Sequence, residues 1–125
     1  MMERTYTVTM SIEGGQLGEE HEEITAAVLT KLIPWLRCSL KDIDRYDSII
    51  AAADYPSQEL RDAERSRYYA KDAMCRLYLC RVTPNILAST YAALGEGDRN
   101  ILRRAWELSM KRPFEATLQA GQSQY

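Results

Sequence analysis

Two different periods of apolar residues divide this chain. From residue 4 to residue 12, apolar residues alternate with threonine and serine, which is the two-residue period of a half-buried strand. From about residue 19 onward they recur every three or four positions, as in amphipathic helices. The pattern therefore predicts a mainly α protein: a compact bundle of about five helices with one N-terminal β-strand, in a single domain of residues 1–125.

Proline and a capping motif divide the first part of the helical region. We expect a first helix from about Glu19 to Ile33, because Pro34 removes a backbone donor and stops or kinks a helix. Ser39 with its following residues resembles a capping box, which predicts a second helix that ends near Ala53.

A longer helical segment is expected from about Pro56 to Arg81. Its end, residues 75–82, is an apolar run that would also suit a strand, since short apolar runs are ambiguous. Helix is the favoured interpretation because no turn signal separates this run from the helix before it.

Residues 83–94 show the signals of another helix. Thr83 and Pro84 have the pattern of an N-cap followed by proline at the first helical position. The helix is expected to end at Leu94, with Gly95 as a left-handed C-cap.

The last main helix is expected to begin at Asp98 as its N-cap and to reach about Lys111. Residues 19–120 would then form the helical bundle, and residues 121–125 a frayed tail. The positions expected to face the core are Ile101, Leu102, Ala105, Leu108 and Ser109.

The strand at residues 4–12 needs a partner, because a single strand leaves its backbone groups unpaired. Residues 114–120 alternate in the same way and could complete a small two-stranded sheet, as could residues 75–82. If neither pairs with it, the strand would join a second copy or the sheet edge of another protein. Internal pairing is favoured, because sheets usually close within their domain.

Charge is segregated along the chain, which the net charge of −2 conceals. Residues 1–62 carry 12 acids and 6 bases, whereas residues 63–125 carry 6 acids and 10 bases. An acidic surface would be steered toward a basic surface of a partner. The alternative is that these acids only solubilise the protein and favour a helix start. The acids expected to form a partner-binding surface are Glu13, Glu19, Glu20, Glu22, Glu23, Asp42, Asp44 and Asp47.

The basic second half suggests an alternative, a DNA-binding regulator. Two helices with a glycine-containing turn at residues 83–112 have the outline of a helix-turn-helix. Against this, the isoelectric point is about 5.5, Tyr91 stands where close packing wants a small residue, and Glu96 occupies a turn position that is usually apolar. The residues expected to contact nucleic acid in this alternative are Arg99, Asn100, Arg103, Arg104, Lys111 and Arg112.

No motif for catalysis or metal binding stands out. The one histidine, His21, lies among glutamates and lacks the second histidine of HExxH, since Thr25 occupies that position. The three cysteines form no CxxC pair, so we expect neither a disulfide framework nor a zinc site, but reduced thiols that mostly fill the core of a cytoplasmic protein. No apolar run approaches the length of a membrane span. We therefore expect no enzyme, no cofactor and no metal.

These observations favour a non-catalytic protein-interaction module. In size and charge the chain is similar to accessory proteins of phages and mobile elements, some of which bind and inhibit nucleic-acid-handling machinery. The expected partner is another protein, itself nucleic-acid-binding in this interpretation, and direct DNA binding is the alternative. A second alternative is a homo-oligomeric structural protein, such as a homodimer in which the acidic half of one copy meets the basic half of another.

Overall fold

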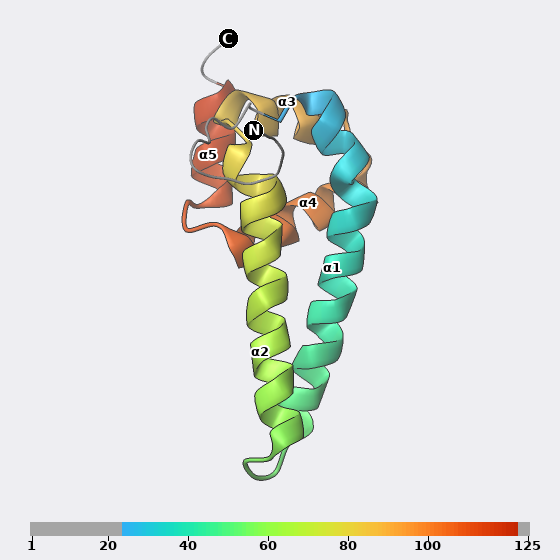
Figure 1. The fold of residues 1–125 in the computed structure, drawn as a ribbon. Coiled ribbons are helices and arrows are strands. Elements are labelled where there is room, and N and C mark those ends of the chain that lie inside the picture. The colour runs from blue at the N-terminus through green and yellow to red at the C-terminus, as the bar shows by residue number, and fades with distance from the viewer. Residues whose placement is uncertain (1–23, 123–125) are drawn as a thin grey trace, which may run out of the picture.

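The computed structural model describes residues 24–122, and these residues fold into five α-helices without a strand (Figure 1). The mainly α prediction is confirmed for this part of the chain. The strand expected at residues 4–12 and the last three residues of the expected tail lie outside the described residues. The helices are α1 (Ala26–Ala52), α2 (Gln58–Ala73), α3 (Pro84–Ala93), α4 (Glu96–Ser109) and α5 (Phe114–Gln122).

The first helix is capped by Thr25, whose side chain accepts a hydrogen bond from the backbone N–H of Val28 at 3.2 Å. Thr25 itself is extended, with φ −74° and ψ 164°, and α1 begins at Ala26. A helix continuous from Glu19 to Ile33 is therefore wrong, because the backbone is not helical at the capping residue.

Helix α1 runs through Pro34 and ends only at Ala52, so the predicted break and the predicted second start at Ser39 are both wrong. Proline removes one backbone hydrogen bond from the helix. Ile33 and Leu36, on either side of it, are both buried on the core-facing side of α1. Burial of this stripe holds the helix together across the proline, because packing supplies most of the stability of helices in proteins.

The segment after α1 is one long helical stretch, as predicted, but its end is irregular. Helix α2 is followed by a π-helical turn at Met74–Tyr78 and a 3-10 turn at Leu79–Arg81. The Arg81 side chain donates a hydrogen bond to the backbone oxygen of Leu77 at 2.6 Å. The strand alternative for residues 75–82 is excluded. The apolar run is only partly buried, since the Leu77 side chain remains 51% exposed.

The turn between α3 and α4 differs from the prediction in the role of its glycine. Gly95 has φ −73° and ψ 168°, so it is not left-handed, and it is the N-cap of α4 rather than the C-cap of α3. Asp98 lies in the first turn of α4 instead of capping it, and α4 ends at Ser109 before the expected Lys111.

Residues 114–120 belong to helix α5, so they cannot be the strand partner that was considered for residues 4–12. The buried residues of this helix are Phe114, Thr117, Leu118 and Gly121, which follow a helical spacing. The alternation seen in the sequence arises from small residues that are exposed in the helix, such as Ala116. Helix α5 also includes Gly121, which was expected to begin the frayed tail.

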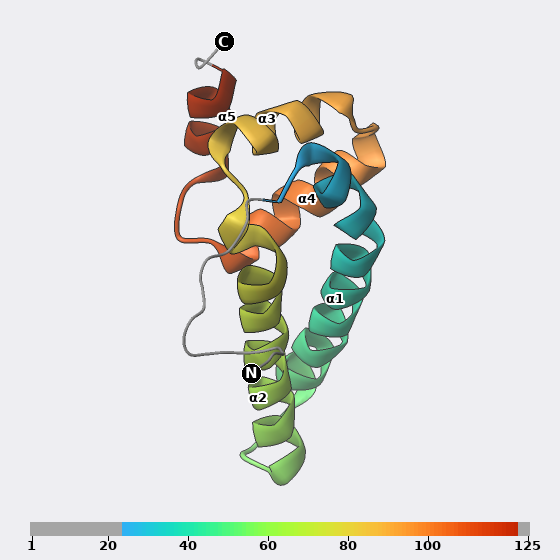
Figure 2. The same ribbon diagram turned by 45° about the horizontal axis from the view of Figure 1, so that its top comes forward.

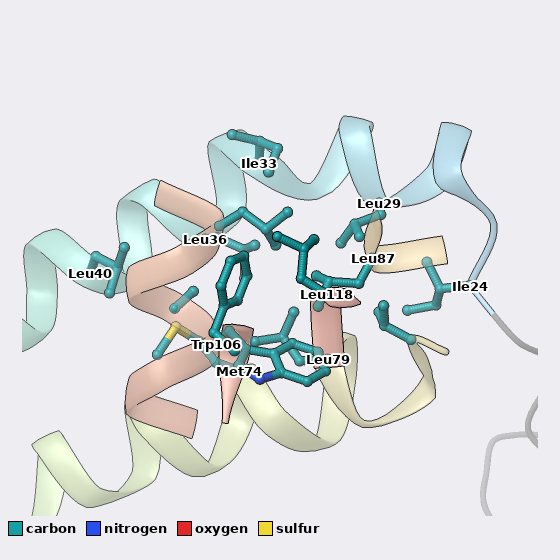
Figure 3. Close-up of a cluster of buried hydrophobic side chains, with 14 of the residues drawn as sticks. Ile24, Leu29, Ile33, Leu36, Leu40, Met74, Leu79, Leu87, Trp106 and Leu118 are labelled. Carbon is teal, nitrogen blue, oxygen red and sulfur yellow. The ribbon is translucent and has the colours of Figure 1, made fainter. Parts of the chain in front are cut away.

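The apolar core contains buried side chains from α1, α3, α4 and α5, together with Met74 and Leu79 from the π and 3-10 turns that follow α2 (Figure 3). Trp106 is fully buried at its centre, although the sequence pattern placed Ser109 in the core and left Trp106 out. The indole N–H of Trp106 donates to the backbone oxygen of Arg112 at 2.9 Å, which satisfies its one polar group.

The helices form a long hairpin with a cap at one end. Helices α1 and α2 pack against each other as antiparallel neighbours, and α3, α4 and α5 gather around the end where α1 begins and α2 finishes (Figures 1 and 2). The other end of the hairpin, which carries the loop between α1 and α2, projects beyond these three helices. The hairpin therefore presents a long surface outside the capped core.

A close backbone contact joins α5 to α3 and yields a test of the packing. A Cβ atom at Gly121 would lie 2.0 Å from the backbone oxygen of Pro84, which is far inside van der Waals contact. We expect Gly121→Ala to destabilise the fold by about 1–3 kcal/mol, as overpacking does. Urea unfolding followed by circular dichroism measures this.

The matched control is Gly97→Ala in α4, where a Cβ meets nothing within 4 Å. This substitution should leave stability unchanged or raise it by up to about 1 kcal/mol, because alanine favours helix more than glycine does. Equal stability of the two variants would show that α3 and α5 do not approach so closely in solution.

Candidate functional site

One side of the α1–α2 hairpin is covered by α4. The Arg37 side chain donates to the Asp98 carboxylate at 2.9 Å, and Arg104 forms a two-point contact with Asp44, with one N···O distance of 3.1 Å. Arg37 and Asp44 are seven residues apart on α1, so both pairs lie on the same side of that helix. In Figure 1, α4 lies behind the hairpin, which is seen from its other side.

The other side of the hairpin carries two stripes of residues, which we call the open face. On each helix the members recur every three or four residues, so each set runs along one side of its helix. The α1 stripe consists of Val28, Leu32, Trp35, Ser39, Asp42, Tyr46 and Ile49. The α2 stripe consists of Glu59, Asp62, Ser66, Tyr69 and Ala73.

A groove of about 410 Å³ lies between the two stripes, in the projecting part of the hairpin. Its lining residues are Tyr46, Ile49, Glu59, Asp62, Ala63 and Ser66. Ile49 and Ala63 contribute apolar surface, and Glu59 and Asp62 contribute carboxylates from the first turns of α2. The groove therefore joins an apolar lining with an acidic edge.

The two carboxylates of the groove differ in their partners. Asp62 accepts a hydrogen bond from Gln58 at 2.7 Å and forms an ion pair with Arg65 at 3.5 Å. Glu59 has no hydrogen-bond or ion-pair partner within residues 24–122. The Ser57 hydroxyl accepts from the backbone N–H of Leu60 at 3.1 Å and so fixes the start of the helix that carries both acids.

Large apolar side chains are exposed along the same open face. Trp35 is 62% exposed, Tyr69 is 59% exposed and Val28 is 44% exposed. The Tyr69 ring also makes an edge-to-face contact with Tyr68, with the ring centres 5.7 Å apart. The other large apolar side chains that are exposed in the described residues, Tyr55, Tyr68 and Leu77, lie outside the two stripes.

The acids expected from the sequence are divided between surface and internal roles. Asp42 lies on the open face and pairs with Arg45 at 3.4 Å. Asp44 pairs with Arg104 of α4, and Asp47 pairs with Arg67 of α2, so both join helices within the molecule. The remaining five lie outside the described residues: Glu13, Glu19, Glu20, Glu22 and Glu23.

Two acids of the groove, Glu59 and Asp62, were not among those expected. The signal that could have revealed them is the spacing of Glu59, Asp62, Ser66 and Tyr69, which is one stripe of a helix. This stripe forms a groove only together with Tyr46 and Ile49 of α1. The sequence alone does not show that the two helices lie side by side.

The basic residues expected to read DNA are held within the structure. Arg99 donates to the backbone oxygens of Tyr91 and Ala92, at 2.8 Å and 3.1 Å, and so satisfies carbonyls at the end of α3. Arg103 donates to Glu115 at 2.6 Å and to the Tyr91 hydroxyl at 3.1 Å. These contacts join α3, α4 and α5.

The other four residues that were expected to contact nucleic acid are of two kinds: two contact side chains within the molecule and two are exposed. Arg104 binds Asp44, and the Arg112 guanidinium lies 5.6 Å from the centre of the Trp106 ring. Asn100 and Lys111 are exposed. The helix pair at residues 83–112 thus uses most of its arginines to hold the cap of the hairpin together.

The cysteines do not fill the core, contrary to expectation. Cys38 and Cys80 are exposed, and Cys75 is half-buried with its sulfur 3.7 Å from that of Met110. Burial raises the pKa of the Cys75 thiol. Within the described residues, no group of three histidine, cysteine or acidic side chains could hold a metal ion, and no helix is long and apolar enough to cross a membrane.

Comparisons of this chain with protein families, with curated proteins and with solved structures give no match. The open face and the charges around it are therefore the features that indicate a function.

The Asp44–Arg104 pair predicts a pH dependence of stability. The hydrogen bond from Arg104 holds the pKa of Asp44 below its ordinary value. The pair therefore stabilises the folded state above about pH 4, and this contribution is lost as the pH falls through the lowered pKa. Asp44→Asn should lower the melting temperature at pH 7, and the gap to the unmodified protein should close as the pH falls below about 4.

Thermal unfolding at a series of pH values measures this gap. The control is Asp54→Asn in the exposed loop between α1 and α2, which should melt like the unmodified protein at each pH. A gap for Asp44→Asn that stays constant down to pH 2 would contradict the assigned ion pair.

Proposed function

We propose that this chain is a non-catalytic protein-interaction module whose open face contacts a basic surface of another protein. The observation that carries the proposal is the acidic edge of the groove, formed by Glu59 and Asp62, beside the exposed side chains of Trp35 and Tyr69. Bases are present next to the stripes at Lys31, Arg45 and Arg65, but none of them lines the groove. Opposite surface charges accelerate encounter and fix the orientation of a complex. Exposed aromatic side chains beside such charges supply contact area.

The use of charge elsewhere in the fold supports this choice over direct DNA binding. Arg99, Arg103 and Arg104 already have partners in α3, α5 and α1, and a DNA contact would have to break these pairs. Glu59, in contrast, has no partner within residues 24–122, so its carboxylate is available for a base from outside the described chain.

We further propose that the partner is a nucleic-acid-handling protein, which the chain inhibits or regulates as an accessory protein of the phage or mobile-element kind. Carboxylates on a rigid helical frame would compete with phosphates for the lysines and arginines of such a partner. Glu13, Glu19, Glu20, Glu22 and Glu23 would extend the acidic surface in this proposal. The exposed thiols of Cys38 and Cys80 suit a reducing compartment such as the cytoplasm.

Affinity capture from a lysate of the native host tests the proposal. The chain is immobilised at low salt, and the lysate is divided into nuclease-treated and untreated halves. We expect one protein partner that survives the nuclease and elutes with salt. Capture should be lost with Glu59→Lys/Asp62→Lys and with reversal of Glu19, Glu20, Glu22 and Glu23 to lysine, because each change replaces attraction by repulsion.

The matched control is Asp54→Lys/Glu64→Lys, which makes the same charge change at exposed positions outside the open face. Capture of the same partner by every variant would overturn the proposal. Nucleic acid lost on nuclease treatment would favour the helix pair at residues 83–112 instead. The mass of the purified chain in solution tests the remaining alternative. A mass that doubles as the protein concentration rises, and returns to that of the monomer in high salt, would favour the homo-oligomer.

A further inference from the structure

We infer that the open face binds an amphipathic α-helix of the partner, apolar on one side and rich in lysine or arginine beside it, laid along the groove between α1 and α2. This inference rests on the proposed function and adds that the bound segment of the partner is an α-helix. The binding site is then a groove that accepts a helix, and not the acidic surface as a whole.

The spacing of the two stripes is that of a surface which receives a third helix. Positions on the α1 stripe alternate between steps of four and three residues from Val28 to Ile49, and the α2 stripe does the same from Glu59 to Ala73. Such a 3–4 spacing places side chains where a packed helix inserts its own. Small residues at Ser39, Ser66 and Ala73 leave room for a close approach.

The length of the face sets the length of the helix it accepts. Seventeen steps separate Leu32 from Ile49 on α1, which at about 1.5 Å per residue is about 26 Å. A partner helix of about 18 residues would cover this distance.

Apolar surface in the groove supplies the anchor for such a helix. The half-buried side chains of Tyr46 and Ile49 form one wall, and Ala63 lies at the base of the α2 side. Trp35 and Tyr69 extend the apolar surface beyond the groove, and both are mostly exposed. Amphipathic helices dock on grooves of this kind through apolar side chains at helical spacing.

The acidic edge of the groove favours a partner helix that carries lysine or arginine. Glu59 stands at the edge of the groove with no partner within residues 24–122, and Asp62 stands one turn further along α2. Arg45 and Arg65 lie beside the stripes and hold Asp42 and Asp62 from outside. A lysine or arginine flanking the apolar side of the partner helix would reach Glu59 directly.

The same charges argue against a second copy of this chain as the occupant. A symmetric dimer brings identical surfaces together, so the open face of one copy would meet that of the other. The lining of the groove includes Glu59 and Asp62 but no base, so the groove of a second copy would offer no counter-charge to Glu59.

Binding of synthetic peptides to the full chain tests the inference. The first probe is a fluorescein-labelled amphipathic helix of about 18 residues, built from leucine, alanine and lysine. The second has the same number of lysines among glycine and serine, so it keeps the charge and cannot form a helix. We expect the helical peptide to bind at least about tenfold more tightly, as measured by fluorescence anisotropy, since one buried apolar anchor is worth that much.

Two variants locate the site. Trp35→Ala/Tyr69→Ala removes apolar anchors without changing charge, and Glu59→Lys/Asp62→Lys reverses the acidic edge. Each should weaken binding of the helical peptide about tenfold. The control Asp54→Lys/Glu64→Lys should bind as the unmodified chain does.

The outcomes separate this inference from the proposed function. Equal binding of both peptides, lost in Glu59→Lys/Asp62→Lys, would overturn the helix and leave the acidic interaction surface intact. The helix inference would also be overturned if the helical peptide bound all three variants as tightly as the unmodified chain, or if neither peptide bound. Capture from the lysate still tests the proposed function independently.

Discussion

Burial of one apolar stripe of α1 is the constraint on which the rest of the structure depends. Leu29, Ile33, Leu36, Leu40 and Ile43 face the interior over about four turns, and they keep one helix continuous across a proline. The other helices pack around this stripe: α2 lies along α1, and α4 covers one side of the α1–α2 hairpin. The opposite flank remains without a helix from the described residues, and this is where the open face lies.

The acidic and basic halves of the sequence are partly paired with each other in the fold. Asp44 and Asp47 come from the acidic half, and Arg104 and Arg67 come from the basic half, yet they pair within the molecule. Part of the asymmetry is therefore used to align helices. In the proposed function, the acids of the open face, such as Glu59, are the ones that contact the partner.

The sequence allowed the helices to be predicted better than their ends or the site. Helical periods correctly indicated a mainly α fold, but local signals at Pro34 and Gly95 were overridden by packing that no local pattern records. Residues 114–120 suggested a strand because small exposed residues happened to alternate with buried ones. Among the groove acids, Glu59 and Asp62 could not be singled out, because their importance depends on Tyr46 and Ile49 lying across the groove from them.

The π turn at the end of α2 has a consequence for how this chain tolerates changes in length. Met74 and Leu79 are both fully buried although they are five residues apart, a separation that a regular α-helix would spread over well more than a right angle. The wider turn brings them to the same side, with Leu77 displaced into solvent. Loss of one residue here would leave Met74 and Leu79 at the ordinary four-residue spacing. We therefore expect the chain to tolerate a deletion of one residue at this turn with both side chains still in the core.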